Sequence, residues 1–344
     1  VGEQAHSRML GPQLHLGCRC RLHQGTHQSV AVDHVRALAM HQAIDGMAGE
    51  TSCHMLERSP AVQGVDEMAQ VAARCDAHAP QRVGRQGRFD AGKVGAQFWS
   101  VYVSANLNDQ QAVQATLEQI DVAKRLVAQY PGDLTLCLDS ACVEAAWKKG
   151  RIASLMGMEG GHSIGGSLAV LRQMYALGAR YMTLTHFKNN SWADAATDAP
   201  AHNGLTPLGK DMVREMQRLG MLVDLSHVSE KTMLDALEVA KAPVIASHSN
   251  AYAINHHPRN VPDRVLDALK TNGGMVMVNF YPPYVVEAAR QWSANREAED
   301  ARLKSLWRGQ PDKAKAALAE WDKANPMPRG SVKDVADHLD YIAK

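Results

Sequence analysis

The chain has 344 residues, of which 45% are hydrophobic and 21% charged, and its formal net charge is +1. This composition is typical of a globular protein, and the length suits one large α/β barrel or two medium domains. The balanced charge gives no electrostatic reason to expect nucleic acid or an anionic membrane as a partner. No apolar run approaches the ~20 residues of a membrane span, and residues 1–10 lack the apolar core of a signal peptide.

Residues 1–88 differ in composition from the rest of the chain. They contain no Lys, Phe, Tyr or Trp, but hold eight of the 16 His and four of the 6 Cys. Without aromatic side chains, this segment has few large groups that could anchor a core. Three interpretations stay open: an atypical, poorly packed leader, a His-rich metal-binding segment, or a stretch that is not the native reading of the gene. The cysteine spacing matches no zinc ribbon and leaves the redox compartment open.

From residue 89 the sequence becomes regular, and its elements can be predicted in chain order. Gly95–Val103 is rich in aromatic and β-branched residues, which predicts a buried strand. Asn108–Tyr130 carries apolar residues on one helical face and ends at Pro131-Gly132, which predicts a helix. A second helix is predicted over Ser140–Lys149, where two lysines lie near the C-terminus.

The remainder of the chain alternates short apolar runs with helix-like segments. This order predicts a parallel sheet, because parallel strands need a crossover connection that is usually a helix. The segment Val285–Lys323 is rich in Ala, Glu, Lys, Arg and Leu, which predicts that it is mostly helical. Three more helices are expected: Ser163–Leu177, one capped by Thr206 with Pro207 at its first position, and one that begins near Pro262. The parallel strands are expected near residues 96–103, 152–158, 181–185, 221–226, 243–247 and 274–279.

Four of the apolar runs stop at a residue that can bind a metal or a proton. These residues are Glu159, His186, His227 and His248. The ends of parallel strands gather at one face of the sheet, so we expect the four side chains to converge there. Two imidazoles and a carboxylate are suited to zinc. Arg259, in a loop before a predicted helix, can hold a substrate carboxylate in its guanidinium fork.

Each of these residues also has a purely structural interpretation. Glu159 can belong to the neighbourhood of a helix start, the histidines can be buried core groups, and Arg259 can be a surface residue. A rival motif, Gly161-His162-Ser163-Ile164-Gly165, fits the Gly-x-Ser-x-Gly elbow of serine hydrolases. In that elbow the serine lies where the strand ends, whereas here the predicted strand ends near Met158. We therefore favour Ser163 as the cap of the next helix.

Several motifs give the chain a family resemblance over about residues 89–344. They are GAQFWSVYV, GMEGGHSI, LTLTH followed by WAD, LVDLSHVS, PVIASHSNAY, RNVPD and MVMVNFY. With them the chain resembles the membrane dipeptidase (renal dipeptidase) family of zinc metallopeptidases. The resemblance implies a TIM-type (β/α)₈ barrel, two zinc ions, and hydrolysis of dipeptides by a metal-activated water. Members are often exported or membrane-associated, and the resemblance allows a homodimer.

The resemblance also implies a role for each candidate residue. Glu159 corresponds to the carboxylate that bridges both metals, and His227 and His248 to ligands of the second metal. His186 corresponds to the catalytic residue that contacts the substrate or the tetrahedral intermediate. Arg259 corresponds to the residue that binds the carboxylate of the dipeptide substrate.

Two departures from the family pattern change what is expected of this chain. Residues 1–88 contain no His-x-Asp pair, which the family carries on its first barrel strand, and the chain stops at Lys344, before the strand with an active-site Asp. We therefore expect a barrel incomplete at both ends, one tight zinc site and weakened activity. Two alternatives are an inactive homologue that binds small carboxylates or nothing, and a related metal-dependent amidohydrolase acting on non-peptide amides.

Overall fold

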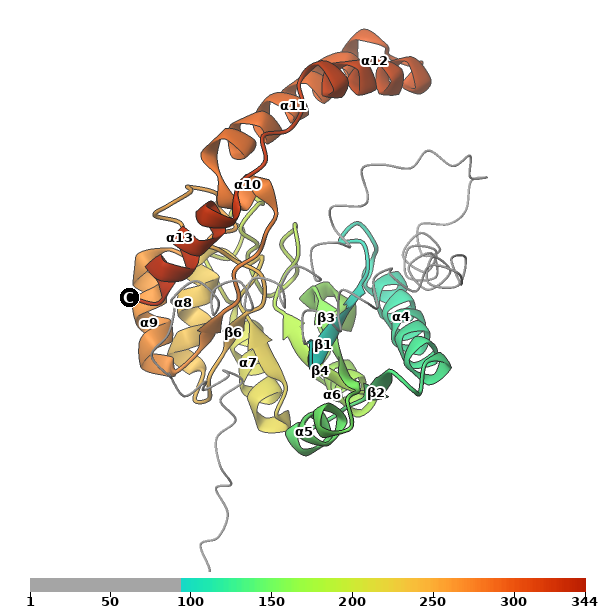
Figure 1. The fold of residues 1–344 in the computed structure, drawn as a ribbon, viewed down its shortest axis with the longest axis vertical. Coiled ribbons are helices and arrows are strands. Elements are labelled where there is room, and N and C mark those ends of the chain that lie inside the picture. The colour runs from blue at the N-terminus through green and yellow to red at the C-terminus, as the bar shows by residue number, and fades with distance from the viewer. Residues whose placement is uncertain (1–93) are drawn as a thin grey trace, which may run out of the picture.

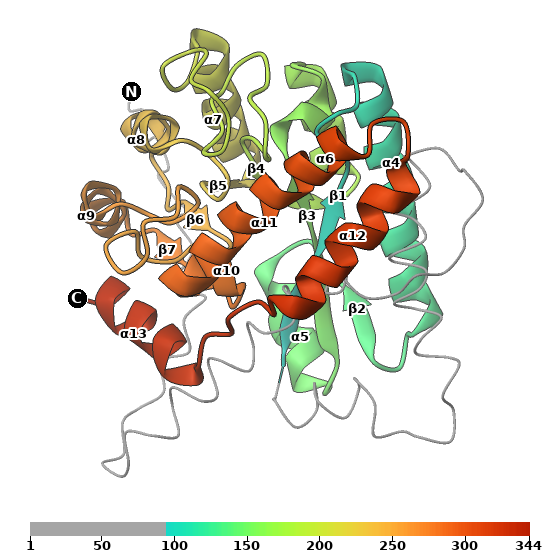
Figure 2. The same cartoon turned by 90° about the horizontal axis from the view of Figure 1, so that it is seen from above.

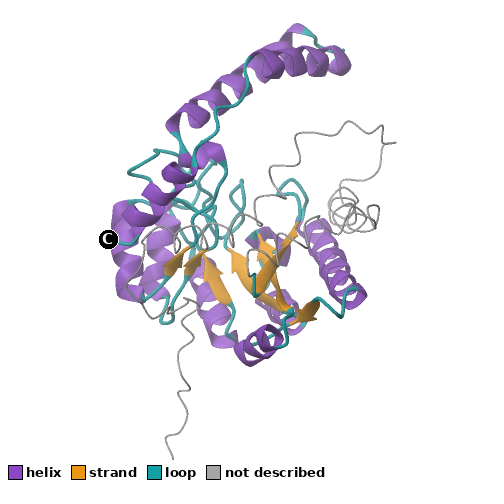
Figure 3. Ribbon diagram, in the orientation of Figure 1, coloured by secondary structure: helices purple, strands orange, loops and turns teal. Residues whose placement is uncertain are grey.

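The structure, a computed structural model, describes residues 94–344 of the chain (Figure 1). The expectations for residues 1–88 concern a segment that lies outside this part. Within it, a curled parallel sheet forms a half-barrel whose outer side is covered by helices (Figure 3). An α/β fold of this kind was the architecture expected from the alternation of apolar and helical segments.

Seven strands form the sheet in the described part of the chain, and every pairing is parallel. Their order is β1-β3-β4-β5-β6-β7, with β2 also paired to β3. All six predicted strands are present, and the last three are short. The bounds are β1 (Ala96–Tyr102), β2 (Leu134–Leu136), β3 (Ile152–Glu159), β4 (Ala179–Thr183), β5 (Leu222–Asp224), β6 (Ile245–Ala246) and β7 (Met275–Val276).

Six helices alternate with these strands and pack against the sheet. Asn108 caps the first with a capping box. Thr206 caps another helix that has Pro207 at its first position, and this cap was predicted. One expectation was wrong: the helix after β3 is capped by Ser167, while Ser163 lies in the preceding 3₁₀ turn, Gly161–Ile164. The bounds are α4 (Asp109–Gln129), α5 (Ser140–Lys148), α6 (Leu168–Ala176), α7 (Pro207–Leu219), α8 (Glu230–Val239) and α9 (Asp263–Asn272).

The core between the sheet and the helices is rich in methionine. Unbranched thioether side chains adapt to irregular gaps between strands and helices. They pack there with branched residues such as Val101, Ile120 and Val223. The buried methionines of this cluster are Met156, Met158, Met174, Met182, Met212, Met216, Met221 and Met233.

After β7 the chain builds a helical extension. Short α10 (Pro282–Val285) leads into α11 (Glu287–Leu306) and α12 (Pro311–Ala324), which form a two-helix arm that extends from the body (Figure 1). The two helices lie side by side (Figure 2), and Arg296 binds Asp322 across them with an Nε–Oδ1 distance of 2.7 Å. The predicted helical character of Val285–Lys323 is therefore confirmed.

The last helix, α13 (Val332–Ile342), returns to the body. Its buried His338 accepts a hydrogen bond from the backbone N–H of Ala251 (3.1 Å), and its Nε2 lies 3.0 Å from the carbonyl oxygen of Val285. A disulfide joins Cys137, which directly follows β2, to Cys142 in the first turn of α5. No helix of the described part is long and apolar enough to span a bilayer.

Candidate metal centre

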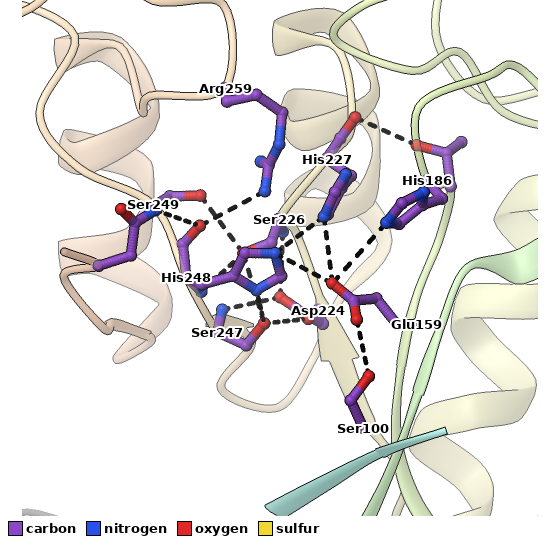
Figure 4. A network of polar contacts seen from close by, with 12 residues as sticks. Ser100, Glu159, His186, Asp224, Ser226, His227, Ser247, His248, Ser249 and Arg259 are labelled. Carbon is purple, nitrogen blue, oxygen red and sulfur yellow. Dashed lines mark hydrogen bonds and ion pairs between the residues drawn. The ribbon is translucent and has the colours of Figure 1, made fainter. Parts of the chain in front are cut away.

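Four elements bring the candidate ligands to the carboxyl-end face of the sheet (Figure 4). Glu159 is the last residue of β3, and His186, His227 and His248 lie in the loops just after β4, β5 and β6. All four side chains are buried. Glu159, His227 and His248 form one group, in which the three candidate ligand atoms lie within 4.8 Å of one another.

The spacing inside this group suits a metal with few ligands. Oε1 of Glu159 lies 3.3 Å from Nε2 of His227 and 3.3 Å from Nε2 of His248. Donors around a tetrahedral zinc with bonds of about 2.0–2.1 Å are about 3.3 Å apart. The two imidazole nitrogens are closer, at 2.8 Å. The two Oε1–Nε2 distances match that spacing, whereas the two imidazole nitrogens lie at a hydrogen-bond distance. The group therefore offers one carboxylate and two imidazoles as donors for a metal ion.

Glu159 is held in the charged form that a cation needs. Its second oxygen, Oε2, accepts a hydrogen bond from Ser100 Oγ on β1 at 2.7 Å. Burial acts to raise the pKa of this carboxyl, but the adjacent imidazoles of His227 and His248 outweigh burial and hold the pKa well below its usual range. The carboxylate therefore carries a negative charge at a buried position.

Two of the imidazoles, those of His227 and His186, are held neutral. Burial, reinforced by the positive charge of Arg259, keeps the pKa of His227 well below its usual value. Burial also lowers the pKa of His186 to about 4, against the opposing effect of Glu159. A histidine must be neutral to offer a lone pair to a metal, so these shifts favour metal binding near neutral pH.

His227 has a backbone conformation that is uncommon for a residue with a side chain. Its φ angle is +72°, in the left-handed region. Two hydrogen bonds to its carbonyl oxygen hold this conformation: one from the N–H of Ala196 (2.7 Å) and one from the hydroxyl of buried Thr185 (3.2 Å). Strain of this kind persists only where the surroundings hold it in place, and it gathers at functional sites.

The loop that supplies Ala196 is itself organised by Asp194. The carboxylate of this buried residue accepts backbone hydrogen bonds from Ala201, His202 and Gly204. Its own carbonyl oxygen accepts from the N–H of Ser229, so the loop is fixed to the start of α8. Sequence analysis noted the Trp-Ala-Asp motif without giving it this role.

His186 lies beside the ligand group rather than within it. Its Nε2 is 3.9 Å from Oε1 of Glu159, and its ring stacks on that of His227 with centroids 4.1 Å apart. Two aromatic rings flank it, Tyr102 at 4.7 Å and Phe187 at 4.2 Å. Phe187 is 49% exposed and also contacts His227, so it forms an accessible apolar wall next to the ligands.

Arg259 is entirely buried, contrary to the surface alternative that its loop position had left open. One of its guanidinium nitrogens, Nη2, donates to the carbonyl oxygen of His248 at 3.5 Å, and its Cζ lies 5.3 Å from the centre of the Tyr284 ring. Among residues 94–344, Nε and Nη1 have no hydrogen-bond partner. Leaving a charged donor buried and unpaired is costly, so this guanidinium is suited to receive an anion.

Comparison with known proteins shows to which family the chain belongs. A sequence profile described as Membrane dipeptidase (Peptidase family M19) matches residues 55–344. The chain belongs to the membrane dipeptidase family. The match covers the motifs that carried the resemblance, and it also includes residues 55–88 of the segment with the atypical composition.

Individual relatives agree with the family match. Dipeptidase tcpJ of Claviceps purpurea (strain 20.1) is 46% identical over 228 residues, which are 64% of this chain and 52% of that protein. The chain thus spans about half the length of this curated relative. The probable dipeptidase PvdM of Pseudomonas aeruginosa has a similar structure, with a TM-score of 0.60 and 24% identity over 68% of this chain and 65% of that one.

A further solved structure is a metallopeptidase of Rhodobacter sphaeroides, liganded with a phosphinate mimic of the dipeptide L-Ala-D-Ala. Its TM-score is 0.58 at 24% identity, and the match covers 65% of this chain and 73% of that one. At this level of identity, both structural likenesses show the fold. The half-barrel thus has the fold of the solved dipeptidases of this family.

In this dipeptidase-family chain, sequence analysis missed a second set of polar residues around the ligands. Buried Asp224, at the end of β5, accepts hydrogen bonds from the backbone N–H groups of Ser226 and Ser247. These two serines directly precede the candidate ligands His227 and His248. The signal was present in the sequence, because a serine precedes each histidine in Asp224-Leu-Ser-His227 and Ile245-Ala-Ser-His248. The pattern does not show, however, that one carboxylate reaches the serines of both strands.

Ser163 gives no support to a serine-hydrolase site. It lies four residues beyond the end of β3 at Glu159, in a buried 3₁₀ turn, and not at the sharp strand end that an elbow requires. Its hydroxyl is fully buried and has no hydrogen-bond partner in the described part of the chain.

Proposed function

We propose that this chain is a zinc-dependent dipeptidase, which hydrolyses the peptide bond of a dipeptide with a free C-terminal carboxylate. The observation that carries the proposal is the buried Glu159–His227–His248 group next to the buried guanidinium of Arg259, two of whose nitrogens have no partner among the residues that the structure describes. The first supplies ligands of the type found in catalytic zinc sites. The second supplies a binding site for the end of a very short peptide.

Three side chains would hold the zinc: the carboxylate of Glu159 and the Nε2 atoms of His227 and His248. A bound zinc ion lowers the pKa of water and polarises a carbonyl group, which is the chemistry that peptide hydrolysis requires. Residues 94–344 offer one such group of three donors. We therefore expect one tightly bound zinc per chain, with a second bound only at high zinc concentration.

Arg259 would bind the C-terminal carboxylate of the substrate. Its Nη2 donates to the carbonyl oxygen of His248, so the guanidinium lies next to a metal ligand. One residue of extended chain spans only about 3.3–3.6 Å. A carboxylate held by Arg259 next to a metal ligand would bring the single peptide bond of a dipeptide to the metal group, which would favour dipeptides over long chains.

His186 would act on the reacting carbonyl. As a neutral imidazole it carries one N–H, and its Nε2 lies at the edge of the ligand group, 3.9 Å from Glu159. A donor placed there can stabilise the negative charge that develops on the carbonyl oxygen. The half-exposed ring of Phe187 would contact the substrate side chain and keep water from this side of the site.

The test uses the full chain loaded with zinc and two matched substrates, a dipeptide and the same dipeptide with a C-terminal amide. We expect hydrolysis of the dipeptide, loss of activity with a chelator, recovery with zinc, and strong discrimination against the amide. His256→Ala is a suitable control for substitutions of the ligands, because His256 is exposed and outside the ligand group. Equal turnover of acid and amide would favour the non-peptide amidohydrolase, and absence of zinc binding would favour the inactive homologue.

A further inference from the structure

A carboxylate, a hydroxyl and an imidazole form a continuous chain behind one of the ligands (Figure 4). Asp224 is fully buried, and its Oδ1 accepts the backbone N–H groups of Ser226 (3.0 Å) and Ser247 (2.8 Å). Its Oδ2 accepts the hydroxyl of Ser247. The same hydroxyl oxygen lies 2.7 Å from Nδ1 of His248.

The chain fixes the direction of each hydrogen bond. A carboxylate can only accept, and a serine hydroxyl has a single hydrogen, so the hydrogen of Ser247 points to Asp224. The oxygen of Ser247 must then accept a hydrogen from His248, and that hydrogen is on Nδ1. In a neutral imidazole with Nδ1–H, the lone pair is on Nε2. This is the atom that lies 2.8 Å from Nε2 of His227, from which it can accept a hydrogen bond, and 3.3 Å from the carboxylate of Glu159.

We propose that Asp224 acts through the hydroxyl of Ser247 to fix the tautomer of His248, so that its Nε2 lone pair always faces the metal group. Both are positioning residues, because they contact the ligand and not the substrate. The inference rests on the proposed zinc site for its purpose, although the tautomer itself is a property of the metal-free chain. Histidine ligands usually donate their second N–H to a carboxylate or a carbonyl, and here a serine stands between the two.

The other histidine ligand provides an internal comparison. Nδ1 of His227 is buried and has no hydrogen-bond partner in the described part of the chain. Position is instead imposed on His227 through its backbone, by the two bonds to its carbonyl oxygen. Side-chain control of the tautomer is therefore assigned to His248.

The substitution Asp224→Asn distinguishes control of the His248 tautomer from a merely structural role of Asp224. The two backbone N–H groups at Oδ1 require an acceptor, so the amide oxygen of the asparagine must occupy that position. Its NH₂ group then faces the oxygen of Ser247 and donates to it. The hydroxyl hydrogen is released to point at Nδ1 of His248, which stabilises the tautomer with Nε2–H. This nearly isosteric change thus places a hydrogen where the lone pair is needed.

The experiment measures the tautomer and the zinc affinity on the full chain. Long-range ¹⁵N–¹H NMR of histidine-labelled, metal-free protein identifies the protonated ring nitrogen, and competition with a chromophoric chelator gives the zinc affinity. We expect Nδ1–H at His248 in the unsubstituted chain, Nε2–H in Asp224→Asn, and a mixture in Ser247→Ala. Zinc affinity should fall about 10–100-fold in Ser247→Ala, and at least as far in Asp224→Asn.

Ser249→Ala is the matched control. Ser249 is as buried as Asp224, follows His248 directly, and its hydroxyl lies 3.3 Å from that of Ser226, outside the chain to Nδ1. It should change neither the tautomer nor the affinity. Nε2–H at His248 in the unsubstituted chain overturns the proposal, as does an Asp224→Asn variant that keeps Nδ1–H and full affinity. If a variant fails to fold, the spectrum of the unsubstituted chain decides. Dipeptide turnover plays no part in this test, so it fails or succeeds separately from the proposed function.

Discussion

Replacing Arg259 by methionine should move stability and activity in opposite directions. In the absence of a ligand, two nitrogens of the buried guanidinium, Nε and Nη1, have no partner among residues 94–344, at a cost of about 1–3 kcal/mol each. Its hydrogen bond to the His248 carbonyl oxygen and its contact with the Tyr284 ring each stabilise the fold by about 1 kcal/mol. A methionine of similar length should therefore stabilise the ligand-free protein by about 2 kcal/mol. For a protein of this size, that raises Tm by roughly 4–8 °C.

Activity should fall in the same variant. Two hydrogen bonds to a substrate carboxylate contribute about 1.5–3 kcal/mol each, so kcat/KM should drop by roughly 10²–10⁴-fold. The discrimination between a dipeptide and its amide should vanish with it. Thermal unfolding and steady-state kinetics check the two parts, and Arg264→Met, at an exposed arginine paired with Glu230, is the control. A less stable Arg259→Met variant that still prefers the acid would refute the reasoning.

Three other substitutions test separate parts of the site and fold. His227→Ala should abolish the tight zinc site, because only two donors, Glu159 and His248, remain and they are too few to hold the ion tightly. The metal content after dialysis measures this. Thr185→Val removes one of two bonds that hold His227 at positive φ, and should weaken zinc binding about fivefold for a loss of about 1 kcal/mol, measured by chelator competition. Hydrogen bonds from Arg218 and Arg172 lower the pKa of Glu215 from 4.5 to about 2. A depressed pKa stabilises the fold above the unfolded-state value, so the contribution of Glu215 should be lost as pH falls from about 4.5 to about 2. Glu215→Gln should be less stable than the parent at pH 7 and equal to it below pH about 2 in urea unfolding; a constant difference would contradict this.

The sequence was most informative where a local pattern determines the outcome. Apolar runs that end at Glu159, His186, His227 and His248 predicted the strands, and parallel order predicted that their ends would gather at one face. The short strand Leu134–Leu136 was missed, because three residues after a turn are too few for a periodic pattern. Ser163 was taken as a helix cap in place of Ser167, since the intervening 3₁₀ turn leaves no distinct signal in composition.

The missed features of the site depend on contacts between distant residues. Asp224 and Ser247 are 23 positions apart and meet only because β5 and β6 are neighbours in the sheet. The burial of Arg259 likewise depends on the segment around Tyr284, which packs over it. Neither pairing can be read from the residues nearby in sequence, although each changes the chemistry that is expected of the site.

Oxidation of the methionines in the core would report when the core opens. A buried thioether is protected from peroxide, and oxidation to the sulfoxide makes it polar and unable to repack. Met275, 38% exposed, should react first, whereas the eight buried methionines of the core should react only when the sheet and helices separate. Their sulfoxide formation, followed residue by residue in mass spectra, would therefore time the opening of each helix against the sheet. Oxidation of the core would also accelerate itself, because each oxidised methionine packs less well and exposes the neighbouring methionines to peroxide.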